Sequence, residues 1–398
     1  MVQFIMQKDL SIIIPFKGKI DQLNNLLDSI SKQSLLPDET IIVNVNKEKN
    51  FKIKKEFSKL NCKVFNYYNL YPGAARNIGI KKAKNEIICL LDIKTIPANT
   101  NWLEDLFKFY SKTKTDVVFG STSYKKNNQN FMSKIVLATS FGNINHETVP
   151  GTITSKAIFN KYGYFYENVR SGEDYEWRKR LIKKKCNFKI NYQNPLLYHG
   201  LDSSITKLSY KYFLYSYHSS KLNILADQKI LFMSFILVLS SLLIPRWNYY
   251  IDDWDNSYLY IPNITKIFIV VLFFFSISYF LYNFLFKINF KFNLFNKLLI
   301  FILIIYFTYC VYNYNYFIID KFDYASLYFP HITKIYILFL LLMVIFFRGI
   351  YLPIKRNINK SFVYKNFLII GITGIILDLS KIPGHIIGFF LLPMTIKK

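Results

Sequence analysis

The sequence predicts an α/β domain with a mostly parallel sheet, followed by an all-α transmembrane domain. In the first quarter of the chain, short runs rich in β-branched residues alternate with helical patterns. Near Asp227 the composition changes to long apolar stretches. Two of these, 267–286 and 298–319, contain no charged residue, and each is long enough to cross a hydrocarbon core of about 30 Å as a helix.

The α/β alternation can be followed element by element. The run Ile87 to Leu91 is wholly apolar, which is typical of a strand at the centre of a parallel sheet. Ligands of such sheets bind at the carboxyl ends of the strands, so the chemistry is expected there. The patterns predict strands at 10–14, 40–45, 62–66 and 86–91, and helices at 20–33 and 73–83.

Three further apolar stretches complete the predicted membrane domain: 230–245, 335–347 and 367–396. The first two are short, and flanking Lys and Arg side chains that snorkel to the interface extend them. Charged residues interrupt the third. It is either one polar-centred span or two half-spans that meet at Pro383-Gly384.

The loops predict how the chain is oriented. Segment 260–267 recurs as 328–335, with a shared Pro-x-Ile-Thr-Lys, which favours a duplicated unit of helix, acidic loop and helix. Loops 252–255 and 320–323 are acidic, whereas the other connections are basic, so the positive-inside rule places the acidic loops outside the cytosol. The N-terminus lacks the basic region of a signal peptide. We therefore expect a multi-pass protein of the inner (plasma) membrane with a cytosolic N-terminal domain.

Three parts are expected along the chain: a domain at 1–202, a helical connector at 203–228 and a transmembrane domain at 229–398. The connector is rich in Tyr and Lys, and is either an interfacial helix on an anionic leaflet or a surface helix of the first domain. The net charge of +26 fits anionic lipid and diphosphate better than nucleic acid, because no basic-aromatic binding module is present. Four widely spaced Cys argue against a disulfide framework or a structural zinc site.

One carboxylate stands where the sheet predicts chemistry. Asp92 directly follows the apolar run that ends at Leu91. A carboxylate there is costly unless it binds a ligand, a cation or backbone amides. The alternative is a turn or helix-capping Asp, which is a common role.

Five motifs occur in an order that resembles the family 2 glycosyltransferases of the GT-A fold. The resemblance covers roughly residues 9–200, about half of the chain. Each motif alone is weak, but five in this order and spacing are specific. They are Ser11-Ile12-Ile13-Ile14-Pro15, Glu39-Thr40-Ile41-Ile42-Val43-Asn44, Gly73-Ala74-Ala75-Arg76-Asn77-Ile78-Gly79, Leu90-Leu91-Asp92-Ile93-Lys94 and Gly172-Glu173-Asp174-Tyr175-Glu176-Trp177-Arg178.

The resemblance implies a donor site for a nucleotide sugar. Pro15 would border the base, and Asn44 occupies the position of an Asp that contacts the nucleoside. Arg76 would face the donor diphosphate or the sugar, which suits a guanidinium because it binds phosphate bidentately. Asp92 matches the first Asp of an Asp-x-Asp motif, which would hold Mg²⁺ or Mn²⁺ on the diphosphate. His199 is a further metal or phosphate contact, or a structural His.

The resemblance also implies a catalytic base. Asp174, or alternatively Glu173, matches the carboxylate that takes the proton of the acceptor hydroxyl. The alternative for this pair is a surface charge cluster beside Arg178 and Arg180.

The chain departs from the family pattern at Lys94, which replaces the second Asp of Asp-x-Asp, and at Asn44. A charged Lys cannot bind a metal. Lys94 either pairs with the donor diphosphate, so that metal dependence is weakened, or points to solvent.

These observations predict a membrane-bound glycosyltransferase that uses a nucleotide-sugar donor and a lipid-linked or saccharide acceptor, in surface polysaccharide or glycoconjugate synthesis. The alternatives are a polyprenyl-phosphate glycosyltransferase, a processive polysaccharide synthase and a catalytically inactive membrane scaffold. The Gln-x-x-Arg-Trp motif of processive synthases is absent from the sequence.

Overall fold

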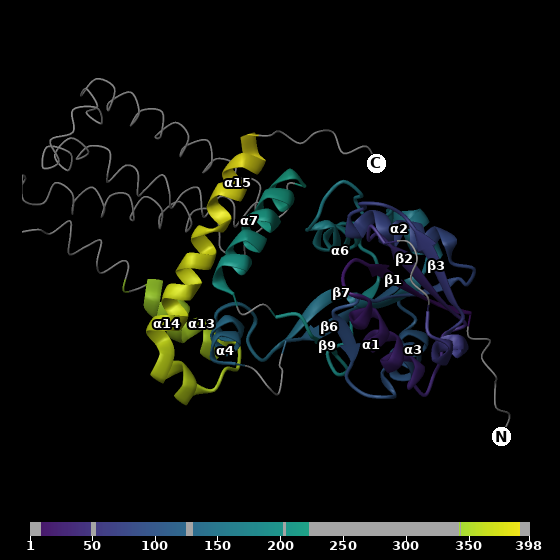
Figure 1. Cartoon of the computed structure of the whole chain (residues 1–398), viewed down its shortest axis with the longest axis horizontal. Coiled ribbons are helices and arrows are strands. Elements are labelled where there is room, and N and C mark those ends of the chain that lie inside the picture. The colour runs from purple at the N-terminus through teal and green to yellow at the C-terminus, as the bar shows by residue number, and fades with distance from the viewer. Residues whose placement is uncertain are drawn as a thin grey trace, which may run out of the picture. The chain divides into compact units, whose positions relative to one another are not determined.

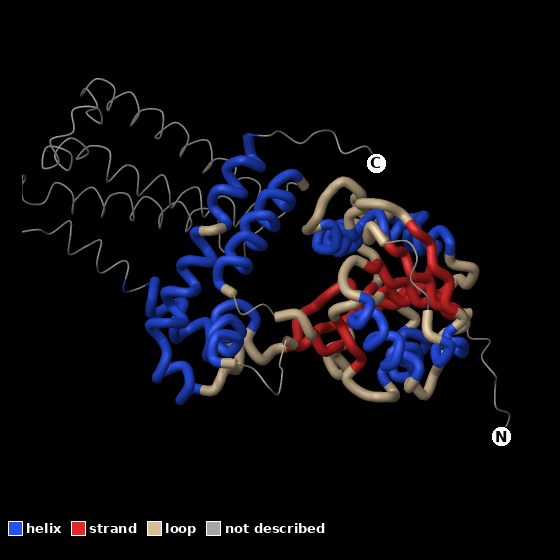
Figure 2. Tube along the Cα trace, viewed as in Figure 1, coloured by secondary structure: helices blue, strands red, loops and turns tan. Residues whose placement is uncertain are grey.

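The computed structural model describes residues 9–48, 53–124, 130–201, 204–222, 342 and 344–390. The chain divides into two compact units, one formed by Met1–Ile224 with Ile345–Lys398 and the other by Leu225–Val344. Nearly all of the second unit lies outside the described residues, and with it the expected spans at 230–245, 267–286 and 298–319 and both acidic loops. The first unit carries almost all of the described elements (Figures 1 and 2).

Within the described residues, a nine-stranded sheet runs in the order β3-β2-β1-β4-β7-β6-β9-β5, with β8 paired to β6. Neighbouring strands among the first four in this order are parallel. β7 is antiparallel to β4 and β6, and β5 is antiparallel to β9, whereas β8 and β9 are parallel to β6. The bounds are β1 (Leu10–Phe16), β2 (Glu39–Asn44), β3 (Cys62–Asn66), β4 (Ile87–Leu90), β5 (Thr95–Pro97), β6 (Val117–Ser123), β7 (Asn145–Ser155), β8 (Phe188–Ile190) and β9 (Leu196–Tyr198).

The sheet is mixed, and its parallel pairings outnumber the antiparallel ones, as expected of a mostly parallel sheet. The regular α/β alternation ends after β4. The long strand β7 enters beside β4 in the opposite direction, so both of its ladders are antiparallel. The predicted strands and helices of the first 91 residues are confirmed, with ends that differ by at most two residues.

Helices cover both faces of the sheet, so β1 is buried on both sides. Leu10, Ile12 and Ile14 pack with α1 and α3, whereas Ile13 packs in a second core with α2, α5 and α6. This period-two alternation is what a pleated strand imposes. The bounds are α1 (Ile20–Ser31), η1 (Lys55–Leu60), α2 (Pro72–Lys82), α3 (Trp102–Thr113), α5 (Lys156–Tyr162) and α6 (Glu173–Lys183).

A helical layer lies at the β6 end of the unit. α14 contacts η2, α4 and η6, and its buried side chains join a core with the first two of these. Gly349 and Gly371 allow the backbone around residues 345–349 to approach α14 closely, as small residues do between membrane helices, and Gly374 leaves room for the Arg348 side chain. The bounds are α4 (Phe131–Val136), η2 (Leu137–Phe141), η6 (Phe347–Tyr351), α13 (Leu352–Lys355) and α14 (Lys360–Leu379).

α7 (Ile205–Lys221) and α15 (Lys381–Phe390) lie side by side (Figure 1). Gly384 permits the contact, because a Cβ there would collide with Ser216 and the Phe213 carbonyl, and Ser220 Oγ lies 3.0 Å from His385 Nδ1. A helix is thus confirmed in the connector 203–228, and it packs within the unit. The expected borders of the three parts stay predictions.

The apolar segment 367–396 is helical as far as Phe390, and its last residues are outside the described part. Of the described residues, one helical stretch, Lys360–His385 with mean hydropathy 1.7, is long and apolar enough to cross a membrane. The boundary between α14 and α15 falls at Ser380, and not at Pro383-Gly384 as one alternative had it. Pro383 explains this position, because its ring clashes with the carbonyl four residues earlier, that of Leu379.

Candidate active site

A cavity of about 880 Å³ opens at the carboxyl ends of the parallel strands. Its walls come from the turns after β1, β2 and β4, from the start of α2, and from α7. Pro15, Asp92 and Lys94, three of the residues expected at a donor site, line it, and their donor roles stay predictions. Asn44, Arg76, Glu173, Asp174 and His199 are not among the lining residues.

A tight turn holds Asp92 and Lys94 at the cavity. The Lys94 backbone N–H donates to Asp92 Oδ1 at 3.0 Å, and Thr95 Oγ1 donates to the Asp92 carbonyl at 2.7 Å. Asp92 therefore combines the two roles expected of it: its side chain caps its own turn, and the residue also lines the cavity. Lys94 lines the same cavity, which is the arrangement expected if it pairs with a ligand there.

The charges around the cavity are unequal. Among the described residues, its lining includes four basic side chains, Lys17, Lys94, Arg170 and Lys211, and a single carboxylate, Asp92. Cations gathered around a partly enclosed space favour an anionic ligand such as a diphosphate. The remainder of the lining is largely aromatic or aliphatic, with Tyr71, Tyr124, Tyr198, Tyr212 and Tyr215 among it.

Arg76 and Glu173 form a buried ion pair. Arg76 Nη1 lies 2.8 Å from Glu173 Oε1, and the two side chains are only 6% and 5% exposed. The pair joins α2 to the first turn of α6, and Arg76 also stacks over the Phe165 ring. Among the described residues, Glu173 Oε2 and Arg76 Nε have no hydrogen-bond partner. Arg76 therefore lies in the interior, and its predicted contact with a donor stays a prediction.

Burial raises the pKa of Glu173 to about 7, and the neighbouring Asp174 adds to the rise while Arg76 opposes it. Glu173 is thus poorly suited to face an acceptor, because it is enclosed. Asp174 is half-buried, and its Oδ1 accepts a hydrogen bond of 2.7 Å from the Tyr175 N–H. It is the better placed of the two candidate bases.

The raised pKa of Glu173 predicts a pH-dependent stability. A carboxyl whose pKa rises from 4.5 to about 7 on folding binds more protons in the folded state between these values. Its contribution, about 3 kcal/mol, is therefore present below pH 4.5 and is lost as the pH rises through 7. We expect the thermal midpoint of the wild type to fall between pH 5 and 7.5, and Glu173→Gln to remove most of this fall. The exposed control Asp21→Asn should keep it, and equal slopes for wild type and Glu173→Gln would contradict the assignment.

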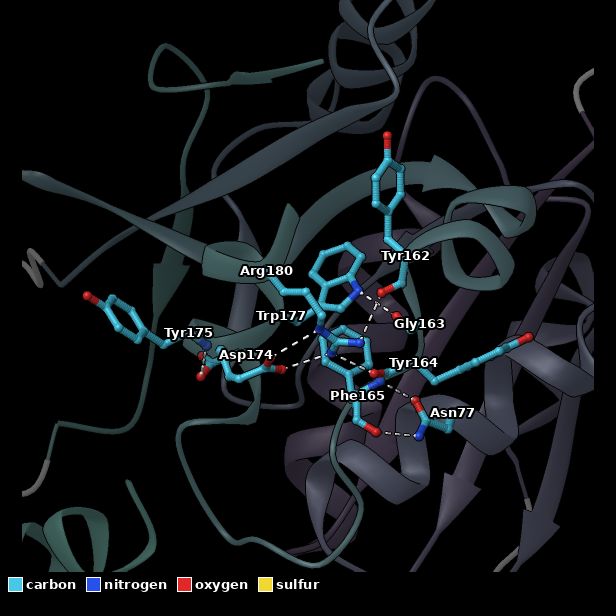
Figure 3. Close-up of polar contacts among 10 residues, drawn as sticks. Asn77, Tyr162, Gly163, Tyr164, Phe165, Asp174, Tyr175, Trp177 and Arg180 are labelled. Atoms are coloured by element: carbon cyan, nitrogen blue, oxygen red, sulfur yellow. Dashed lines mark hydrogen bonds and ion pairs between the residues drawn. The ribbon is translucent and has the colours of Figure 1, made fainter. Parts of the chain in front are cut away.

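A clamp of hydrogen bonds fixes α6, which carries Asp174 (Figure 3). Arg180 Nη1 and Nη2 donate to the carbonyls of Tyr162 and Tyr164 at 3.1 and 2.7 Å. Trp177 Nε1 donates to the Gly163 carbonyl at 3.2 Å. The alternative of a surface charge cluster does not describe Arg180, because its guanidinium is used within this clamp.

The segment 162–165, which accepts the hydrogen bonds of this clamp, is also held by α2. Asn77 Nδ2 donates to the Phe165 carbonyl at 2.8 Å, and the Phe165 N–H donates back to Asn77 Oδ1 at 3.0 Å (Figure 3). The Asn of the Gly-Ala-Ala-Arg-Asn-Ile-Gly motif therefore couples α2 to the loop before α6. Sequence reasoning assigned it no role, because its partner lies far along the chain.

Asn44 is buried, and its side chain orders the end of β2. Nδ2 donates to the Glu48 carbonyl and to Asn66 Oδ1, both at 2.8 Å, and Oδ1 accepts from the Asn46 N–H at 3.1 Å. Its neighbour Val45 lines the cavity. The nucleoside role expected of Asn44 stays a prediction, and what it does in the structure is to shape this wall.

The donor set for a metal is small. The His199 N–H donates to the Lys94 carbonyl at 2.8 Å, but residue 199 is exposed and does not line the cavity. In the described part of the chain, no group of three or more His, Cys, Asp or Glu side chains could hold a metal ion. Asp92 alone fits a divalent cation only if the remaining ligands are oxygens of a bound diphosphate and water.

Tyr215 shows which other charged groups surround the cavity. Burial raises the pKa of Tyr215 to about 12; Arg170 acts to lower it, while Asp174 and Asp92 act to raise it further. Burial likewise raises the pKa of Tyr124, to which the same two carboxylates contribute. The charges of Asp174 and Asp92 therefore favour the neutral form of these two Tyr side chains.

The comparisons with known proteins concern the domain that carries this cavity. The family model described as "Glycosyl transferase family 2" matches residues 11–199. A glycosyltransferase of Rickettsia bellii is 27% identical over 183 residues, which is 43% of this chain and 26% of that protein. The Bacillus subtilis glycosyltransferase YwdF is 40% identical over 84 residues, which is 21% of this chain and 31% of that protein.

Residues 11–199, just under half of the chain, are therefore similar to a family 2 glycosyltransferase domain. The chain matches less than a third of the length of either curated relative. Among solved structures, the mannosyltransferase PcManGT from Pyrobaculum calidifontis, in complex with GDP-Man and Mn²⁺, superposes with a TM-score of 0.40 and 13% identity over 54% of this chain and 64% of that one. S. aureus TarS 1-349 in complex with UDP-GlcNAc gives 0.37 and 20%, over 52% and 65%.

Proposed function

We propose that the protein is a membrane-bound glycosyltransferase that moves a sugar from a nucleotide-sugar donor to a lipid-linked acceptor at the cytosolic membrane face. The observation that carries this proposal is the cavity at the strand ends, where Asp92 stands among four basic side chains. A nucleotide diphosphate matches this charge pattern, and the family 2 domain supports the class of reaction.

Each residue has a role in the proposed transfer. Lys17 and Lys94, which follow β1 and β4, hold the diphosphate, and Pro15 borders the base. Asp174 takes the proton from the acceptor hydroxyl as its oxygen bonds to the anomeric carbon. The bond from that carbon to the diphosphate oxygen breaks, and the leaving group carries the electron pair into the field of the cations.

A divalent cation, Mg²⁺ or Mn²⁺, fits this site in part. Asp92 would hold it together with diphosphate oxygens, and it would supply charge stabilisation to the leaving group. Lys94 supplies a fixed positive charge to the same cavity. We therefore propose a metal requirement that is weaker than that of a site with two carboxylates.

Lys94 variants test this weakened dependence. Lys94→Asp adds the missing carboxylate and is expected to raise the apparent metal affinity, whereas Lys94→Ala is expected to lower turnover at any metal concentration. The measurement is the transfer rate against free Mg²⁺ or Mn²⁺ for the three proteins. Identical metal curves for wild type and Lys94→Asp, together with an unimpaired Lys94→Ala, would show that Lys94 has no part in the reaction.

The helices support membrane attachment. α14 buries Val363 and Ile370 against the α4–η2 layer, and it also carries exposed apolar side chains. These are Leu368, Ile369, Ile372, Ile376 and Leu379, each at least 41% exposed. Charges within the same stretch are paired, as membrane segments require: Asp378 lies 2.9 Å from Arg348 Nε and 2.8 Å from Lys381 Nζ.

The proposed orientation predicts accessibility of the acidic loops, which lie outside the described residues. Cys introduced at Asn256 or Tyr324 is expected to react with an impermeant maleimide in intact cells, because loops poor in Lys and Arg are exported. A Cys at Asp21, in the catalytic unit, should react only after lysis. Labelling of the Asp21 variant alone in intact cells would show that the chain has the opposite orientation.

A screen of nucleotide sugars against the detergent-solubilised full chain tests the proposed function. Release of a nucleoside diphosphate from one donor, increased by membrane lipid extract, is the expected result. Transfer to a polyprenyl phosphate itself would instead assign a polyprenyl-phosphate glycosyltransferase. A long polymer product would indicate a processive synthase. No turnover of any donor, with intact folding, would leave the inactive scaffold.

A further inference from the structure

The wall of the cavity that α7 contributes has its own chemistry. Tyr215 lies on this wall, and Ser171 Oγ donates to its carbonyl at 3.4 Å, so α7 is tied to the loop that leads into α6. This loop carries Arg170, and α6 begins with Glu173 and Asp174. The candidate base therefore stands next to α7, and the acceptor must approach from this side for Asp174 to take its proton.

Two cations flank Tyr215. Lys211 Nζ lies 5.5 Å from the centre of the Tyr215 ring, and Arg170 directly precedes Ser171, which donates to the Tyr215 carbonyl. Both side chains line the cavity. They come from α7 and from the loop before α6, whereas Lys17 and Lys94 come from the strand ends. The four cations thus form two pairs on different elements, and a donor diphosphate at the strand ends engages the second pair.

The α7 wall is apolar beside its cations. Leu208, Tyr212 and Leu214 line the cavity along the same helix as Lys211. Leu208 also packs against Leu377 of α14, the helix with the exposed apolar side chains. Lys381, at the start of α15, stands over the Tyr212 ring at 5.0 Å. An anionic group at Lys211 therefore has apolar side chains of α7 next to it, and Leu208 connects this wall to the buried core that α7 shares with α14.

We propose that Arg170 and Lys211 bind a phosphate or diphosphate ester of the acceptor, with Tyr215 between them. This inference rests on the proposed function, because only a sugar transfer makes the bound ester an acceptor. It assigns that acceptor a chemical class. Two cations of different kinds suit a diphosphate: the guanidinium binds it bidentately and the ammonium acts as a point charge. The ester comes either from a lipid headgroup or from a soluble sugar phosphate.

Binding to the full chain in detergent tests the assignment without requiring turnover. The probes are inorganic pyrophosphate, farnesyl diphosphate, farnesol and a panel of nucleoside diphosphates, measured by calorimetry. Arg170→Ala and Lys211→Ala are expected to lower the affinity for farnesyl diphosphate at least tenfold. They should lower the affinity for the preferred nucleoside diphosphate less than threefold. Lys17→Ala and Lys94→Ala should show the reverse pattern. Lys211→Arg should retain most of the affinity for farnesyl diphosphate. Lys207→Ala, on the exposed side of α7, should change the affinity for neither ligand.

The outcomes separate the ideas. Farnesyl diphosphate that binds at least tenfold more tightly than pyrophosphate indicates a lipid source, and equal affinities indicate a soluble ester; both support the assignment. If Arg170→Ala and Lys211→Ala weaken the nucleotide as much as the ester, the cations belong to the donor and the inference is wrong. It is also wrong if neither farnesyl diphosphate nor pyrophosphate binds, or if farnesol binds as tightly as farnesyl diphosphate. If no nucleoside diphosphate binds but the ester does so through Arg170 and Lys211, the proposed function fails and the ester site stands.

Discussion

Asp174→Asn is expected to lower sugar transfer by about 10²–10⁴-fold, the usual contribution of a general base. The amide keeps the shape of the side chain and can still accept the hydrogen bond from the Tyr175 N–H, so α6 should fold unchanged. It cannot take a proton, because an amide is not basic at neutral pH. Donor binding should persist, since Asp174 is not among the residues that line the cavity.

The measurement is the transfer rate together with the affinity for the donor nucleotide. Asp21→Asn makes the same chemical change at an exposed position on α1 and should leave both quantities unchanged. Glu173→Gln separates the neighbouring carboxyl. If Asp174→Asn retains nearly full turnover while Glu173→Gln loses it, the base is Glu173, despite its burial. If both variants are active, neither residue is the base.

Arg76→Ala is expected to destabilise the catalytic unit by about 3–5 kcal/mol, because it leaves the Glu173 carboxyl buried without its ion-pair partner. The loss should fall at the lower end below pH 7, since Glu173 can take up a proton and become neutral. It is measured as a shift in the midpoint of denaturant unfolding at pH 6 and pH 8, and we expect the larger shift at pH 8.

The matched control removes both charges. Arg76→Met combined with Glu173→Met replaces the pair by apolar side chains, and it should recover most of the stability, because an apolar pair leaves no charge buried alone. Donor affinity then shows whether Arg76 also has the donor contact that the family resemblance implies. An Arg76→Ala protein with an unchanged midpoint would mean that the ion pair contributes nothing to folding.

The sequence was a good guide to elements with local signals. The period-two pattern of β1 and the helical spacing of Leu23, Leu26, Leu27 and Ile30 predicted elements that the structure confirms. The position of Asp92 and Lys94 at the cavity could also be predicted, because the end of an apolar strand in a parallel sheet marks its ligand-binding edge.

Features that depend on distant partners could not be predicted in this way. Arg76 and Glu173 are far apart in the chain, so only the folded structure shows that they form an ion pair with each other. The mixed character of the sheet depends on where β7 enters beside β4, which no local pattern specifies. Lys211 and Tyr215 stood out only as part of a Tyr-rich basic helix, and their place on the cavity wall follows from tertiary packing.

The pairing of α7 with α15 makes the catalytic unit discontinuous along the chain. Ser216, His218, Ser219 and Ser220 of α7 are buried, and part of their cover is a helix that begins only at residue 381. A chain cut after residue 224 would keep every strand of the sheet and still expose one side of the helix that walls the cavity. Truncation after residue 224 would therefore weaken this wall, and truncation to residues 11–199 would remove it. Co-expression of residues 345–398 as a separate fragment offers a route to complement it.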